Sequence, residues 1–71
     1  MKPEFIETAQ NDPDCEIRLG VASWAKGNNA IKSIKYAKRD KNGKVTRSGE
    51  FPVEALRQAL DFAIKNGYIR P

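Results

Sequence analysis

Histidine is absent from this 71-residue chain, and cysteine occurs once, at position 15. Without histidine there is no imidazole to act as a general base near neutral pH or to bind a metal ion. One thiol cannot form an internal disulfide or a thiolate metal site, and its acidic neighbours Asp14 and Glu16 disfavour a reactive thiolate. The sequence therefore predicts a protein that is not an enzyme and that binds no metal ion and no cofactor.

Long apolar runs are also missing. No stretch approaches the roughly 18 residues that a transmembrane helix needs, and Met1 is not followed by a basic and then apolar leader. A single unpaired cysteine fits a reducing compartment. We therefore expect a cytoplasmic protein with no membrane partner. With 71 residues, the chain is expected to form one domain that has little room for a small-molecule substrate.

Positive charge is in excess and is unevenly distributed along the chain, whose net charge is +4. Residues 1–17 carry one basic residue against five acidic ones, a net charge of −4. Residues 18–47, the basic block, carry nine basic residues against Asp40 alone, a net charge of +8. Such a block attracts phosphates, although a lysine-rich solvated surface is the alternative. The acidic first segment is a candidate shield for the basic block.

Alternating apolar and polar residues predict three strands. Residues 15–24 place Ile17, Leu19 and Val21 on one face, with Arg18 and Trp24 on the other. Residues 30–39 form the second strand, with a bulge or a late start near its first residues. Basic side chains leave from both of its faces, Lys32 and Lys38 on one and Lys35 and Arg39 on the other. Asn42-Gly43 is a strong hairpin signal, and residues 44–51 return as the third strand.

The two ends of the chain complete the predicted fold. Phe5 and Ile6 form a candidate edge strand, and Pro52 opens a helix that ends before Gly67. Phe62 lies off the apolar stripe of this helix, so either the tail covers it or it is a self-association face. The predicted fold class is α+β: an antiparallel meander of three strands, with a candidate fourth, and one C-terminal helix packed on one sheet face. The single domain then comprises an acidic segment (1–14), the meander (15–51), the helix (52–66) and a tail (67–71).

Single-stranded nucleic acid is bound by cations along its backbone and by aromatic faces that stack on its bases. The basic block offers the cations, and Trp24 is the predicted stacking residue. Burial in the core is the alternative for Trp24, and for Tyr36 core packing is favoured. The predicted nucleic-acid-binding residues are Arg18, Trp24, Lys26, Lys32, Lys35, Lys38, Lys44 and Arg47.

A family resemblance rests on short motifs between residues 17 and 64. The runs Ile34-Lys35-Tyr36, Asp40-Lys41-Asn42-Gly43-Lys44 and Gly49-Glu50-Phe51-Pro52, followed by the helix, resemble the transcriptional coactivator family known as positive cofactor four. The resemblance implies a curved antiparallel sheet, dimerisation through the helices and single-stranded DNA binding along the sheet. It also implies phosphate contacts at Lys32, Lys35, Lys38, Lys44 and Arg47. The chain departs from the family pattern at Ala37, where a second bulky aromatic residue is usual, in its longer turn at 26–29 and in its acidic first segment.

The leading hypothesis is a small, dimeric protein that binds single-stranded DNA or RNA with low sequence specificity through the basic hairpin. One alternative is a protein–protein interaction module that uses the helix or a sheet edge, with the basic block only solvated. A second alternative is a binder of double-stranded RNA or of the ribosome, which would use the same cations with less need for exposed aromatic residues.

Overall fold

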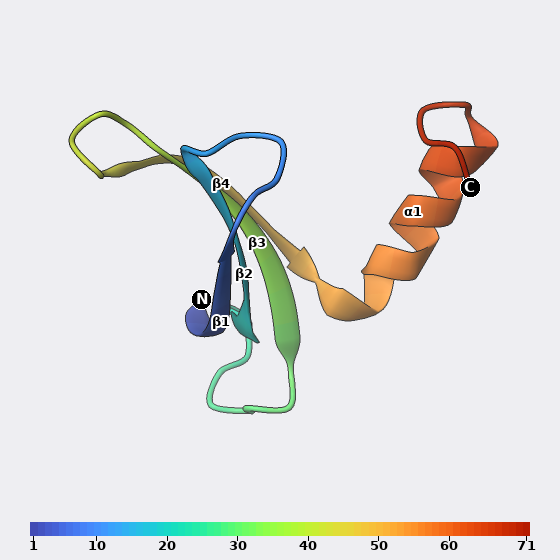
Figure 1. The fold of residues 1–71 in the computed structure, drawn as a ribbon. Helices are drawn as coiled ribbons and strands as arrows, with labels where there is room; N and C mark the ends of the chain where they lie inside the picture. Colours follow the sequence, from blue (N-terminus) through green and yellow to red (C-terminus); the bar gives the residue numbers. More distant parts are fainter.

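The computed structural model describes the backbone of all 71 residues and every side chain except that of Arg47. Four strands, a short 3-10 turn and one helix follow in order: β1 (Lys2–Thr8), β2 (Cys15–Val21), β3 (Lys32–Arg39), β4 (Val45–Pro52), η1 (Val53–Ala55) and α1 (Leu56–Lys65). The strands form one antiparallel sheet in the order β1-β2-β3-β4 (Figure 1). The predicted α+β class, the meander and the C-terminal helix are confirmed. Neither helical element has the length and apolar character needed to cross a membrane.

Strand register decides which side chains share a sheet face. Directly paired residues lie on the same face, and the pairs include Leu19 with Phe5, Leu19 with Ile34, and Ile34 with Phe51. We call this side the aromatic face: Phe5, Ile17, Leu19, Ile34, Tyr36 and Phe51, with Lys32 and Lys38 at the two ends of β3. The opposite side is called the inner face: Arg18, Ser33, Lys35, Ala37, Arg39 and Glu50.

The sheet curls toward its inner face. Pro3 pairs with Gly20, and a Cβ added at Gly20 would collide with the carbonyl oxygen of Lys2 and lie 2.8 Å from the Cα of Pro3. Strand β1 therefore crosses closely over β2. The N-terminal ammonium of Met1 reaches to 4.0 Å from the carboxylate of Glu50 on β4. The two edge strands thus approach each other across the inner face at this end of the sheet. The strands are strongly bent (Figure 1).

The core of the single chain is small. Its buried apolar residues are Ala9, Cys15, Val21, Ala22, Ala25 and Ala37. Among the described side chains, no leucine, isoleucine or aromatic residue is buried. Because apolar burial is the main stabilising contribution to folding, a sheet with so few buried apolar atoms has a narrow stability margin.

A buried polar cluster stands where a larger core would lie. Ser33 is fully buried and donates from its hydroxyl to Oε1 of Glu50 at 2.7 Å, and the same oxygen accepts the Ser23 N–H at 3.0 Å. Burial alone would raise the pKa of Glu50, but the hydrogen bonds from Ser33 and Ser23 outweigh it, so the pKa is lowered. The ionised form of Glu50 is therefore the form that the fold favours.

The helix differs from its expected position. Instead of lying on a sheet face, α1 extends past the end of β4 (Figure 1) and contacts η1, and none of its residues is buried. Leu56 and Leu60, at the centre of its apolar stripe, are 42% and 43% exposed. The cause lies in the connection: η1 follows β4 directly and α1 follows η1, so no loop reverses the chain and brings the helix back over the sheet.

Candidate nucleic-acid interface

Three aromatic rings on the aromatic face are open to solvent. Phe5 is 71% exposed, Tyr36 42% and Phe51 36%. They come from β1, β3 and β4, and the register between the strands places them on one side of the sheet. Exposed rings on an open sheet face are the feature on which bases stack in proteins that bind single strands. This face is therefore the candidate interface.

Phe5 and Phe51 were missed by the sequence reasoning. Each lies on the same face as Tyr36 only because of cross-strand pairing. Phe51 pairs with Ile34, two residues before Tyr36 on β3. Alternation within one strand does not predict which residues of the neighbouring strand lie on the same face. The signal that could have placed Phe51 beside β3 was the Asn42-Gly43 turn, which limits the register between β3 and β4.

Trp24 lies beyond the end of β2, in the connection to β3, and not on the sheet. Its side chain is 41% exposed, so it is not buried in the core. It lines a shallow hollow of about 470 Å³ at the Lys32 end of β3, together with Ala30, Ile31, Lys32, Pro52, Val53 and Glu54. The sequence placed Trp24 beside Arg18; the structure places it beside Lys32, which belongs to the aromatic face.

Lys38 is paired with the loop that joins β1 to β2. Its ammonium lies 3.1 Å from Oδ2 of Asp12, and the neighbouring Asn11 donates from its amide to the hydroxyl of Tyr36 at 3.0 Å. The hydrogen bond from the Asp14 N–H has the largest effect on the pKa of Asp12 and lowers it, and the interaction with Lys38 lowers it further. The ion pair with Asp12 in turn raises the pKa of Lys38. One end of the aromatic face is thus in contact with an acidic loop.

Lys32, at the other end of β3, is also paired. Its ammonium lies 2.9 Å from Oε1 of Glu4. Glu4 is the extra residue of the β-bulge between Pro3 and Phe5 on β1. Both lysines that β3 places on the aromatic face therefore have carboxylate partners from the acidic segment, which are the contacts that a shield would make.

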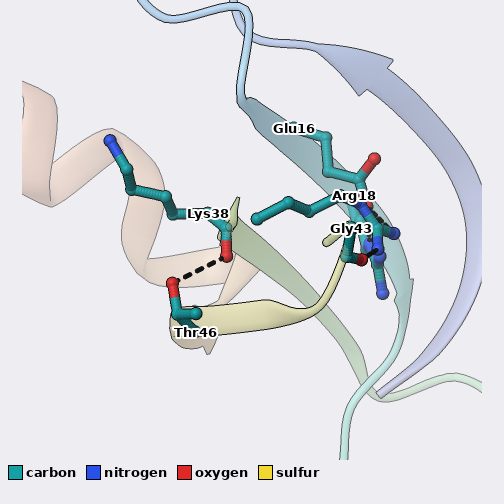
Figure 2. Close-up of polar contacts among 6 residues, drawn as sticks. Glu16, Arg18, Lys38, Gly43 and Thr46 are labelled. Carbon is teal, nitrogen blue, oxygen red and sulfur yellow. Dashed lines mark hydrogen bonds and ion pairs between the residues drawn. The ribbon is translucent and has the colours of Figure 1, made fainter. Parts of the chain in front are cut away.

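Arg18 and Arg39 share one carboxylate on the inner face. Glu16 accepts from Nε of Arg18 at 2.7 Å and from Nη2 of Arg39 at 2.9 Å, while Nη1 of Arg39 donates to the carbonyl of Gly43 at 2.7 Å. The two guanidinium groups, Arg18 first, lower the pKa of Glu16. Figure 2 shows the side chain of Lys38 directed away from Glu16 and Arg18, so this cluster and the aromatic face lie on opposite sides.

The remaining predicted residues are dispersed. Lys26 lies in the β2–β3 connection with a left-handed backbone (φ 51). Lys35 lies on the inner face opposite Arg18, and the backbone N–H of Lys44 donates to Asp40 in the β3–β4 turn. Arg47 pairs with Lys38 through the backbone of β4, but its side chain lies outside the described ones. Of the predicted set, the structure thus places Lys32 and Lys38 at the two ends of the aromatic face, with Trp24 at the Lys32 end.

Phe62, the predicted self-association residue, is 68% exposed on α1. It lines a shallow hollow of about 330 Å³ with Phe51, Ala55, Gln58 and Ala59. Phe51 also belongs to the aromatic face, so an apolar surface continues from the sheet onto the helix.

Comparison of the chain with protein-family models, with curated proteins and with solved structures finds no match. The resemblance to positive cofactor four, the cytoplasmic location and the absence of catalysis therefore stay predictions. The geometry of the chain itself is the basis for inferring its function.

Proposed function

We propose that the protein binds single-stranded nucleic acid, with low sequence specificity, across the aromatic face. The observation that carries the proposal is the position of Phe5, Tyr36 and Phe51, which are exposed on one open sheet face between Lys32 and Lys38. Aromatic faces stack on any base, and lysines neutralise the phosphates. The two lysines are six residues apart on β3, about 20 Å at roughly 3.3 Å per residue, which is long enough for several nucleotides.

The inner face is the poorer candidate, although it carries Arg18, Lys35 and Arg39. Both arginines are engaged by Glu16, and no exposed aromatic residue lies among them. Arg18 and Lys35 are directly opposite each other in the register, an arrangement of like charges that destabilises a sheet. A polyanion bound here would contact cations without stacking, as double-stranded RNA would.

The proposal is tested by titrating a fluorescently labelled oligothymidylate with the protein at several salt concentrations. We expect binding whose logarithm falls linearly with the logarithm of salt concentration, with a slope of about −0.7 for each phosphate neutralised. A salt-independent signal, or no binding at micromolar protein in low salt, rejects the proposal.

Replacing Tyr36 separates stacking from charge. Tyr36→Leu keeps an apolar side chain but removes the ring, so it should weaken binding by about 1–3 kcal/mol, the range for one stacked base. Tyr36→Phe keeps the ring and loses only the hydroxyl that accepts from Asn11, so it should bind at least as tightly as the unchanged protein does. Equal affinities of the two variants would point to phosphate contacts alone. If Trp24→Ala shows the larger loss, the stacking site moves to the hollow beside Lys32.

Self-association is a second candidate function, favoured by the position of α1. No part of the chain that the structure describes covers its apolar stripe, and its residues are exposed or half-buried. An isolated helix of ten residues is marginal in water, and a second copy that covers the stripe would supply the missing apolar burial.

Sedimentation of the protein at several concentrations tests this second candidate. We expect a dimer at micromolar concentration, and Leu60→Glu should convert it to monomers because it places a charge in the stripe. Lys65→Gln changes the net charge by the same unit at an exposed polar position of α1 and should leave the dimer intact. A monomer at all concentrations, with α1 still helical by circular dichroism, would contradict self-association.

A further inference from the structure

We propose that the acidic N-terminal segment competes with nucleic acid for Lys32 and Lys38, so that a bound strand must displace Glu4 and Asp12. This inference rests on the proposed function and adds an intramolecular competitor to it. Its starting point is that both lysines that β3 places on the aromatic face are paired with carboxylates of the same segment, at 2.9 Å and 3.1 Å.

The Lys38 end is held by an ordered turn. Oδ1 of Asp12 accepts the Asp14 N–H at 2.9 Å, which leaves Oδ2 for Lys38. The carbonyl of Asp12 accepts the Cys15 N–H at 3.0 Å, and that of Cys15 accepts the Ala9 N–H at 2.9 Å. The turn is thus preformed, and it presents a carboxylate oxygen to Lys38 where a strand would present a phosphate oxygen.

The same turn also contacts an aromatic ring of the interface. The side-chain amide of Asn11 donates to the hydroxyl of Tyr36. A strand that stacks on Tyr36 and contacts Lys38 therefore meets two contacts of one loop. Displacing this loop is a step that binding at an unoccupied lysine would not require.

The Lys32 end is held by the β-bulge. The extra residue in β1 interrupts the alternation between Pro3 and Phe5, and the carboxylate of Glu4 reaches Lys32 across β2. The pair is open to solvent, with side-chain exposures of 45% for Glu4 and 40% for Lys32. Exposed ion pairs contribute little stability, so a polyanion with several phosphates can displace them, whereas a lone small anion has little advantage over a tethered carboxylate.

The test is the double variant Glu4→Gln/Asp12→Asn, titrated with the same labelled oligothymidylate. Asparagine retains the oxygen that accepts the Asp14 N–H, so the turn is preserved while the charge is lost. The matched control is Asp61→Lys, which makes the same change of two units in net charge. Asp61 lies on α1, outside the sheet, where its partner is Arg57.

We expect the test variant to bind roughly three- to tenfold more tightly than the unchanged protein at low salt, as two exposed ion pairs no longer compete. Its log–log salt slope should also be steeper, by up to about 1.4 for two additional phosphate contacts at about 0.7 each. The control variant should show a smaller gain and an unchanged slope. If the unchanged protein binds the oligonucleotide, and the test and control variants have the same affinity and the same salt slope, the competition is overturned. The proposed function then still stands.

A second measurement identifies the lysine. Lys38→Gln should weaken binding more in the Asp12→Asn background than in the unchanged background, because Lys38 contributes fully only after its partner is neutral. Equal losses in the two backgrounds overturn the competition at this end. Should neither the unchanged protein nor any variant bind the oligonucleotide, the proposed function and this inference both fail; binding by the Glu4→Gln/Asp12→Asn variant alone supports the competition.

Discussion

At the scale of single residues, small side chains determine the shape of this sheet. Gly20 allows β1 to cross β2 at a distance that any Cβ would prevent, since the backbone of Lys2 and Pro3 occupies the space. Ala37 and Ser33, on the neighbouring strand, are fully buried. The close crossing brings Met1 to Glu50 and so closes one end of the inner face.

Gly20→Ala should therefore destabilise the fold, because the added methyl group collides with the backbone of Lys2 and Pro3, which cannot move aside as a flexible side chain could. We expect a loss of about 1–3 kcal/mol, the range for overpacking, measured as the free energy of unfolding in urea. Gly49→Ala is the matched control. It is also a glycine within a strand, but a Cβ there meets nothing within 4 Å, so its stability should be unchanged or slightly raised. Equal stabilities of the two variants would contradict the close crossing.

At the scale of elements, sequence patterns predicted the strands and the helix and left their arrangement open. Alternation in residues 15–21 and the Asn42-Gly43 turn predicted β2 to β4 within a few residues, because these signals are local. The helix was also predicted, from Pro52 and the apolar stripe. Its position was not, because an amphipathic stripe indicates that a partner exists without identifying it. In this chain the direct β4–η1–α1 connection decides the position.

The candidate site was predicted in the same partial way. Alternation along β3 correctly separated Lys32 and Lys38 from Lys35, because side chains alternate strictly in a strand. The alternation could not predict the ion-pair partners of these lysines, because Asp12 and Glu4 lie more than twenty residues away in the chain. Only the register of β1 on β2 and the fold of the loop bring them close. The same holds for Phe5 and Phe51, which join Tyr36 across strands.

At the scale of the whole molecule, ionised carboxylates add to the stability that the small apolar core provides. Three carboxylates, Asp12, Glu16 and Glu50, join separate parts of the sheet: a loop to β3, β2 to β3, and β4 to the N-terminus. Each has a pKa below its ordinary value. The stability of the fold therefore depends in part on these groups being ionised.

This dependence predicts sensitivity to acid. A carboxyl group whose pKa is lower in the folded state stabilises the fold above its unfolded pKa, and the stabilisation is lost as the pH falls through the folded value. The ordinary values are 3.8 for Asp12 and 4.5 for Glu16 and Glu50. We expect the urea midpoint to be constant above about pH 6 and to decrease steadily below about pH 5.

The control for this pH series is Glu50→Gln, which keeps an oxygen to accept from Ser33 but cannot titrate. Its midpoint should be lower than that of the unchanged protein at pH 7 and should change less on acidification. A midpoint that is the same at pH 7 and pH 3 would contradict the role of the three carboxylates.

The direct passage from β4 into η1 and α1 has a consequence for how the chain tolerates changes in length. With no loop to absorb an extra residue, one insertion between Pro52 and Val53 would turn every later position by about 100° around the helix axis. The side of α1 that carries Leu56 and Leu60 would then point in a new direction relative to the sheet. In this molecule the number of residues between the last strand and the helix therefore fixes the direction in which the apolar stripe faces.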